Sequence, residues 1–417
     1  MAGEWEERRL GDLVESYDAI RIPVKEPDRK PGPYPYYGAS GVVDHIDQFL
    51  FDGEYLLIAE DGENLRTRNT PVAFIANGQF WVNNHAHVVR GNSDADTRFL
   101  MYALAGTDIS GFLSGSTIPK LTQGSLRQIP ILTPPLNEQR RIARILGSLD
   151  DKIDFNRRMS VTLEAMALAL FNSWFVDFDP VRAKLEGRAS ALPPEVCQLF
   201  PSAFEDSEAG QMPAGWQVAP IADCCVEIQN GGTPSRDEPT FWEGGEIPWL
   251  TSGEVRQPIV VSTTQFITAA GLASCAAKWA RPFSTVVALY GATAGQVSMV
   301  ASEVTTNQAI CSLIPKDHFA FFNYFSLRAA TSQLESKAVG SAQQNISKGI
   351  VEETKVVLPP RELLTRFHDS VAPLFGRWIS CLRESSHLAV IRDRLLAQLI
   401  PGMTRPASEQ SGLGVSH

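Results

Sequence analysis

An apolar stripe about forty residues long constrains the fold of this 417-residue chain more than any other feature. Between residues 137 and 176, steps of alternately four and three residues reach mostly apolar side chains. These positions are Ile142, Leu146, Leu149, Ile153, Asn156, Ser160, Leu163, Ala167, Leu170 and Trp174. One narrow stripe of this spacing predicts a helix of roughly 60 Å that buries a single seam, as in a coiled coil. Such a helix needs a partner.

The partner helix is predicted at residues 361–400, with every seam position shifted by 225 residues. The shifted positions are Phe367, Val371, Leu374, Trp378, Cys381, Ser385, Leu388, Arg392, Leu395 and Leu399. The same offset aligns residues 115–135 with 340–360 without a gap, and the two segments match at both glycines, a serine and the closing Pro-Pro. Matches at turn residues favour a true internal repeat. The alternative is two unrelated core helices of one large domain.

Antiparallel pairing of these helices about their centres would place the polar Asn156 beside Cys381. A buried asparagine commonly fixes the register of a coiled coil. In the second helix, Pro373 and Gly376 predict a kink or a break, because proline removes a backbone donor and collides with the preceding turn.

The two helices divide the rest of the chain. The predicted segments are a first globular domain at 1–136, a first helix at 137–176, a connector at 177–215, a second domain at 216–360, a second helix at 361–400 and a disordered tail at 401–417. Short apolar runs between turn residues, such as 55–59 and 284–290, predict strands in both domains. The predicted fold is α+β: two similar mixed α/β domains in a pseudo-two-fold arrangement, separated by two long antiparallel coiled-coil helices.

Composition limits the class of protein. An apolar content of 44% is ample for two cores. No apolar run approaches twenty residues and acidic residues lie near the start, so we expect a cytoplasmic protein that does not enter a membrane. The six cysteines form no Cys-x-x-Cys pair, which disfavours zinc and predicts reduced thiols.

The sequence lacks the common catalytic motifs. It contains no phosphate-binding loop, dinucleotide fingerprint, His-Glu-x-x-His or Gly-x-Ser-x-Gly. His85 and His87 could face one side of a strand, but no third metal ligand is evident. Asp177 and Asp179 could form a carboxylate pair, although a turn that ends the first helix is the favoured interpretation. We therefore expect no catalytic residue and no metal in this chain.

Two similar but non-identical domains on a helical spacer suit duplex DNA, which has local two-fold axes of its own. Amide and amine side chains in the repeated loops, and arginines in turns, can reach base edges or phosphates. The candidates are Lys120, Gln123, Arg66 and Arg68 in the first domain, and Arg281, Gln343, Gln344, Asn345 and Lys348 in the second. A solvated surface loop is the alternative for each of them.

At several motifs the chain resembles the specificity subunit of type I restriction-modification systems. The motifs are PPLNEQRRIA at 134–143, WFVDFDPVRAK at 174–184, GGTPS at 231–235, IPWLTSGEV at 247–255 and LPP at 358–360. The resemblance implies two target recognition domains for a bipartite sequence in double-stranded DNA. It also implies helices that bind two methyltransferase subunits and, through them, restriction subunits. Those partners would use S-adenosylmethionine, ATP and magnesium, and this chain would hold no cofactor.

The charge balance argues against tight DNA binding by the chain alone. Residues 1–135 carry 12 Lys and Arg against 18 Asp and Glu, and residues 216–360 carry 9 against 12. Because phosphate contacts supply much of the affinity for DNA, we expect tight binding only with partner subunits. Two other classes stay open at this point: a stand-alone enzyme such as a nuclease, and a coiled-coil scaffold that binds only proteins.

Overall fold

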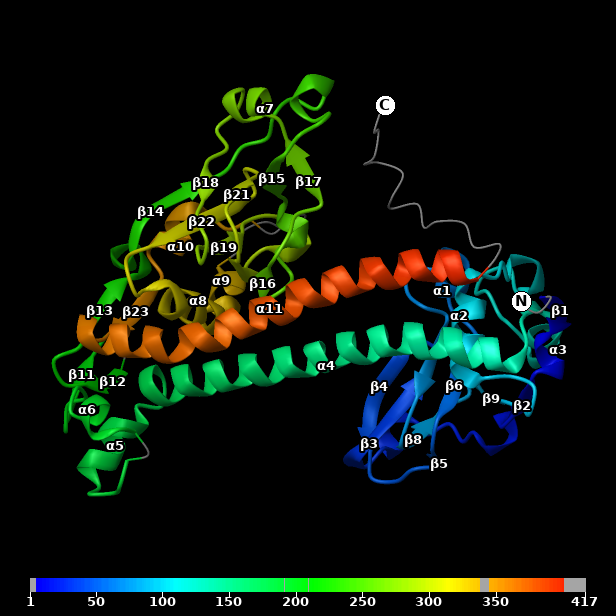
Figure 1. The fold of residues 1–417 in the computed structure, drawn as a ribbon. Coiled ribbons are helices and arrows are strands. Elements are labelled where there is room, and N and C mark those ends of the chain that lie inside the picture. The colour runs from blue at the N-terminus through cyan, green and yellow to red at the C-terminus, as the bar shows by residue number, and fades with distance from the viewer. Residues whose placement is uncertain (1–4, 191, 209, 338–344, 401–417) are drawn as a thin grey trace. The chain divides into compact units, whose positions relative to one another are not determined.

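The computed structural model describes residues 5–190, 192–208, 210–337 and 345–400. Two compact units divide the chain, and Figure 1 labels their elements. Unit 1 combines residues 1–154 with 386–417, and unit 2 is residues 155–385. Each unit therefore contains one globular domain and part of each long helix. The predicted tail at 401–417 lies outside the described residues.

Unit 1 is built from two four-stranded sheets. The first has the order β2 (Val14–Ser16), β9 (Ala86–Gly91), β6 (Tyr55–Ala59), β7 (Ala73–Ala76). The second has the order β4 (Gly41–Ile46), β3 (Pro31–Gly38), β8 (Gln79–Val82), β5 (Phe51–Asp52), with β3 and β8 parallel. A separate pair joins β1 (Glu6–Arg9) to β10 (Pro130–Thr133). Helix α2 (Thr97–Gly106) begins where Asp96 caps the amide of Phe99, and it buries Phe99 and Leu100 in the core with Leu56.

Unit 2 repeats this strand order. Its first sheet is β14 (Cys225–Asn230), β22 (Ile310–Pro315), β19 (Thr285–Ala288), β20 (Val297–Val300), with β16 (Ile259–Val260) added at the edge. Its second sheet is β17 (Gln265–Ile267), β15 (Ile247–Leu250), β21 (Val304–Thr306), β18 (Trp279–Ala280), with β15 and β21 parallel. The pair β13 (Gln217–Pro220) and β23 (Lys355–Leu358) matches β1 and β10. The predicted internal repeat is thus a repeat of topology as well as of sequence.

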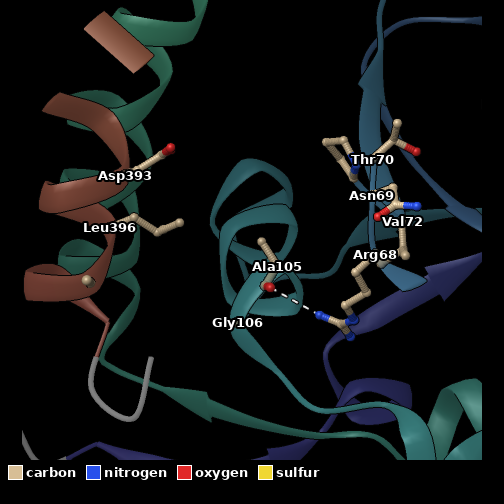
Figure 2. A pocket seen from close by; sticks show the side chains of 10 residues that line it. Arg68, Asn69, Thr70, Val72, Ala105, Gly106, Asp393 and Leu396 are labelled. Atoms are coloured by element: carbon tan, nitrogen blue, oxygen red, sulfur yellow. Dashed lines mark hydrogen bonds between the residues drawn. The ribbon is translucent and has the colours of Figure 1, made fainter. Parts of the chain in front are cut away.

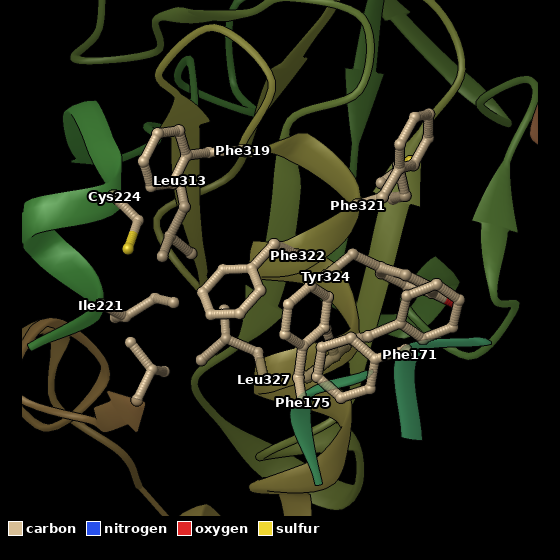
Figure 3. Packing of buried hydrophobic residues seen from close by; sticks show 14 of the residues in the cluster. Phe171, Phe175, Ile221, Cys224, Leu313, Phe319, Phe321, Phe322, Tyr324 and Leu327 are labelled. Carbon is tan, nitrogen blue, oxygen red and sulfur yellow. The ribbon is translucent and has the colours of Figure 1, made fainter. Parts of the chain in front are cut away.

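Short helices complete both units. They are α1 (Asn64–Thr67), α3 (Gln123–Gln128), α5 (Asp179–Leu185), α6 (Pro194–Cys197), α7 (Ala269–Ala273), α8 (Ala320–Ala329), α9 (Thr331–Ser336) and α10 (Lys348–Glu352). The connector also carries the hairpin β11 (Phe204–Ser207) and β12 (Gly210–Pro213). Figure 3 shows how α8 fills the core of unit 2: Phe322 packs against Phe171 and Phe175 of the first long helix, at ring-centroid distances of 6.1 and 5.3 Å.

The long helices are α4 (Leu136–Phe175) and α11 (Arg361–Leu399), each within a residue or so of its predicted ends. In both units they pair antiparallel. In unit 1 Arg392 bonds Asp150, and in unit 2 Phe171 and Trp174 pack around Phe367. Of the twelve predicted seam residues, Ile142, Leu146, Leu163, Phe367 and Trp378 are buried, and Leu149, Ile153, Leu170, Leu374, Leu388, Leu395 and Leu399 are partly buried. None of these twelve side chains is exposed, as a buried seam requires.

Two details of the seam differ from the prediction. Helix α11 continues through Pro373, so the predicted break is wrong. Pro373 and Asp369, whose carbonyl loses its donor, both lie on an exposed face where water can satisfy that carbonyl. The buried Asn156 donates from Nδ2 to Oε2 of Glu384 at 2.8 Å and so finds its polar partner one turn beyond Cys381. The aromatic packing farther along the seam sets this register.

Among the described residues, no single helix is long and apolar enough to cross a membrane. Only α4 and α5 taken together reach the length and the apolar composition of a membrane-spanning segment, and this pair is bent by 46°.

Candidate nucleic-acid interface

One edge of the first sheet in unit 1 gathers several loops. Strand β2 ends at Ser16 opposite Val89, and β6 ends at Ala59 opposite Ala86. Because neighbouring strands are antiparallel, the segments after β2 and β6 and the segment before β9 leave at the same edge. A fourth segment closes over them, since the amide of Leu121 donates to the carbonyl of Glu60 at 2.8 Å. We call residues 17–22, 60–66, 83–85 and 114–123 the first loop edge.

Unit 2 builds the same edge from the equivalent segments. The amide of Ile346 donates to the carbonyl of Leu289 at 2.8 Å, as Leu121 does to Glu60. A single β-bridge joins Tyr290 to Asn345, as another joins Asp61 to Lys120. We call residues 231–236, 289–296, 307–309 and 345–348 the second loop edge.

The turn before β9 and the turn before β22 are held alike. Oδ1 of Asn83 accepts from the amide of His85 at 2.8 Å, and Oδ1 of Asn307 accepts from the amide of Ala309 at 3.1 Å. This local bond, in which an asparagine side chain substitutes for a backbone acceptor, fixes a tight turn. The two edges therefore share one backbone frame.

The side chains on this frame differ at five matched positions. The matched residues of the first and second loop edges are Asp61 and Tyr290, Asn84 and Gln308, His85 and Ala309, Lys120 and Asn345, and Gln123 and Lys348. The last pair follows from the helix caps, because Thr122 and Ser347 cap α3 and α10 in the same way. Two similar supports thus carry two different sets of donors and acceptors.

A buried charge cluster lies beneath the first loop edge. The ring of His87 is 1% exposed and lies between Oδ2 of Asp18, 2.6 Å from Nδ1, and the carbonyl of Leu121, 2.8 Å from Nε2. The carbonyl only accepts, and so does Asp18 when it is ionised, so both ring nitrogens then donate. Arg21 adds a bond from Nη1 to Oε2 of Glu60 at 2.7 Å. The cluster ties the loop after β2 to the segment that carries Lys120.

Both carboxylates of this cluster favour the ionised form. Burial raises the pKa of Asp18, but hydrogen bonds from His87 and the Val88 amide outweigh burial and leave the pKa below its usual value. Burial likewise raises the pKa of Glu60, and the bond from Arg21 with the nearby His87 lowers it further than burial raises it. No motif in the sequence predicts this cluster, because its members come from four separate segments.

Three predicted candidates come together at the first loop edge. Lys120 is half exposed and places Nζ 3.3 Å from Oε1 of Glu60. Gln123 donates from Nε2 to Oγ of Ser16 at 2.9 Å. Arg66 donates to Oε2 of Glu63 at 3.1 Å.

Arg68 has a different environment. Its backbone is left-handed, with φ of 51°, and its guanidinium donates to the carbonyls of Ala105 at 3.1 Å and Thr107 at 2.6 Å, at the end of α2. Figure 2 shows Arg68 on one wall of a pocket of about 340 Å³, with Leu396 of α11 on another. Burial lowers the pKa of Arg68. This arginine caps a helix and does not lie at the loop edge.

The candidate residues of unit 2 also lie in different parts of the unit. Asn345 and Lys348 lie at the second loop edge, where Lys348 places Nζ 3.2 Å from Oε1 of Glu352. Arg281 lies at the opposite end of β19 and donates to the carbonyl of Pro315 at 2.5 Å. Gln343 and Gln344 lie outside the described residues.

The described residues contain no group of three or more His, Cys, Asp and Glu that could hold a metal ion. His85 pairs with Asp61 at 2.8 Å, away from His87. Asp177 and Asp179 flank the turn between α4 and α5, as the favoured interpretation predicted. Burial raises the pKa of the Cys311 thiol to about 12, and the Cys224 and Cys225 thiols behave alike, so these thiols stay protonated and unreactive.

Comparison with known protein families identifies the family to which a chain with these two loop edges belongs. The family model for the type I restriction modification DNA specificity domain matches residues 2–165 and 213–363, about three quarters of the chain. The chain belongs to this family. As a specificity subunit it carries two DNA recognition domains and performs no catalysis of its own. The resemblance inferred from the motifs is confirmed.

Individual relatives agree with this assignment. The type I restriction enzyme HindI specificity subunit of Haemophilus influenzae is 29% identical over 69% of this specificity subunit and 71% of its own length. The MjaIX specificity subunit of Methanocaldococcus jannaschii is 22% identical, over 96% and 94% of the two chains. A solved S subunit of a type I restriction-modification system from M. genitalium has a TM-score of 0.64 at 17% identity, covering 96% of this chain and 97% of that one. This last likeness shows the fold alone.

Proposed function

We propose that this specificity subunit recognises a bipartite, asymmetric DNA target through its two loop edges, one half of the target at each edge. The observation that supports this proposal most strongly is the shared backbone frame with different side chains at five matched positions. Because the two backbone frames are alike, the two loop edges can approach DNA in the same orientation. Different donors and acceptors then select different bases.

The side chains at the edges suit base recognition without a metal. In the first loop edge, Asn84 and Lys120 offer an amide and an amine, and His85 offers a ring nitrogen. In the second, Gln308 and Asn345 offer amides, and Tyr290 offers a phenol that is 38% exposed. Amides can bond adenine in a bidentate way, and lysine can bond the acceptors of guanine.

Partner subunits complete the proposed complex. The chain has a net charge of −10, so counterion release from this subunit alone supplies little affinity. We propose that two methyltransferase subunits bind the long helices and that restriction subunits bind through these methyltransferase subunits. The partner subunits would use S-adenosylmethionine, ATP and magnesium. The complex would work in the cytoplasm, where the cellular DNA lies.

An exchange of one domain tests the assignment of half-targets. Residues 216–357 are replaced by the equivalent segment of a related subunit, the complex is expressed with its methyltransferase, and the methylated motif is determined by sequencing modified DNA. We expect a change in one half of the motif only. A parallel exchange in the first domain is the matched control and should change the other half. If either exchange alters both halves together, the proposed division of the target is wrong.

A finer version of this test uses single side chains. Gln308→Ala and Asn345→Ala should relax the sequence methylated at one half, and Asn84→Ala and Lys120→Ala should relax it at the other. Loss of a good bidentate pair costs about 1–3 kcal/mol of discrimination. Met166→Ala, on an exposed face of α4, should leave both halves unchanged.

A further inference from the structure

Within the second loop edge, the guanidinium of one arginine lies over the rings of two tryptophans. The guanidinium of Arg236 stands 3.7 Å from the ring centroid of Trp242 and 5.1 Å from that of Trp249. Both indoles also fix the loop, because Trp242 donates from Nε1 to the carbonyl of Ser235 and Trp249 donates to that of Gly232, each at 2.9 Å. The arginine side chain itself is exposed. Stacking on an indole restrains the guanidinium and leaves its edge open to an anion.

Unit 1 contains an arginine in the equivalent place. Arg29 stands 4.6 Å from the ring centroid of Tyr36, which pairs with Asp44 across β3 and β4. Trp249 occupies the position of Tyr36, and it pairs with Gln265 across β15 and β17. Both arginines come from the loop that joins the first sheet to this strand.

The two arginines bond to the same cross-strand position, but the partner differs in charge. Arg29 donates from Nη1 to Oδ2 of Asp44 at 3.1 Å. Arg236 donates from Nη2 to Oε1 of Gln265 at 2.8 Å. A carboxylate offsets the charge of Arg29, whereas a neutral amide leaves the charge of Arg236 in place. Asp237 and Glu238 follow in the chain, yet within the described parts of the chain no ion pair links a carboxylate to Arg236.

We propose that Arg236 binds a backbone phosphate of the half-target at the second loop edge, and that Arg29 makes no equivalent charged contact at the first. This inference rests on the proposed function. A phosphate is the favoured partner because Gln265 leaves the charge of Arg236 in place, and because an exposed guanidinium offers a fork of donors that fits phosphate oxygens. The two half-targets would then be held with unequal dependence on salt.

The test measures DNA affinity of the complex, purified with its methyltransferase, as a function of salt concentration. The probe is a labelled duplex that carries the methylated motif, and an unrelated duplex is the reference. The slope of log affinity against log salt is negative, and Arg236→Gln should reduce its magnitude by about 1, the value for one lost phosphate contact. Gln265→Glu should reduce the magnitude of the slope by a similar amount, because it recreates the ion pair of unit 1 while the stacked arginine is retained.

Unit 1 provides the matched controls. Arg29→Gln should leave the slope unchanged, and Asp44→Asn should increase its magnitude by about 1, because the charge of Arg29 is released. All four variants should methylate the original motif. Slopes equal to wild type for both Arg236→Gln and Gln265→Glu would overturn the inference, as would a changed motif with an unchanged slope, which would indicate a base contact. If the wild-type complex does not prefer its own duplex, the proposed function itself fails.

Discussion

Replacing Phe367 with alanine should destabilise unit 2 more than any other single truncation in α11. The side chain is 0% exposed and stands against three rings of α4. Its ring centroid is 6.1 Å from that of Phe171, 5.8 Å from Trp174 and 4.9 Å from Phe175. It is the point where the seam between the two long helices joins the core of the second recognition domain.

The magnitude follows from burial and rigidity. Truncation of a buried phenylalanine to alanine costs about 3–5 kcal/mol, and the cost is greatest where neighbours cannot close the cavity. The rings around Phe367 all lie on α4, and those of Phe171 and Phe175 also pack against Phe322 of α8, so collapse into the cavity is restricted. We therefore expect a loss of about 4–5 kcal/mol in the free energy of unfolding. With a urea dependence of about 3 kcal/mol per molar, the unfolding midpoint of unit 2 falls by roughly 1.5 M.

Urea unfolding of the full chain, followed by tryptophan fluorescence and circular dichroism, measures this shift. Met166→Ala is the matched control, because Met166 lies on α4 and its side chain is 52% exposed. A surface truncation of this kind should change stability by no more than about 0.5 kcal/mol. If Phe367→Ala loses less than about 1 kcal/mol, or no more than Met166→Ala, the packing described here does not hold the helices together.

Two further predictions concern unit 1. Asp150 accepts from the hydroxyl of Tyr102 at 2.5 Å and from Nη1 of Arg392 at 2.8 Å. Asp150→Asn should therefore lower the free energy of unfolding, measured in urea, by about 1–3 kcal/mol. An unchanged unfolding midpoint would show that these hydrogen bonds contribute nothing to stability. Asp18 and Glu60 have lowered pKa values, so their ionised forms stabilise unit 1 above about pH 4, and this stabilisation is lost as the pH falls through the lowered values. Asp18→Asn should flatten that acid dependence in thermal melts between about pH 2 and 5, and a melting curve with the wild-type dependence would contradict the assignment.

The seam could be predicted from the sequence because helix periodicity is local. Spacing of apolar residues within forty positions is enough to find α4 and α11, and the constant offset is enough to find the repeat. The partner of Asn156 could not be predicted in this way, since the register depends on how Phe171 and Trp174 pack around Phe367. Periodicity also says nothing about which helix face tolerates a proline.

The candidate site was predicted only in part, because the hydrogen-bond partners of a side chain cannot be read from the sequence. The repeated loop is visible in the sequence, and it contains both Lys120 and Asn345, which the structure places at the two loop edges. Neighbouring carbonyls are not visible, and Arg68 and Arg281 donate to carbonyls of distant residues. Arg236 was missed for the same reason, because its position depends on pairing between β15 and β17. A motif string shows that a loop is shared, whereas only the strand register shows which residues correspond.

The core of unit 1 is assembled from both ends of the chain. Ile142 and Leu146 share it with Leu395, Leu399 and Ile400, the last part of α11. During translation at about 5–20 residues per second, the roughly 240 residues in between take about 10 to 50 s to emerge. During that interval the apolar stripe of α4 in the first-made domain is exposed, and it can bind chaperones or the same stripe of another nascent chain. A premature stop codon just before residue 386 would therefore damage the domain that was made first and spare the domain beside the stop.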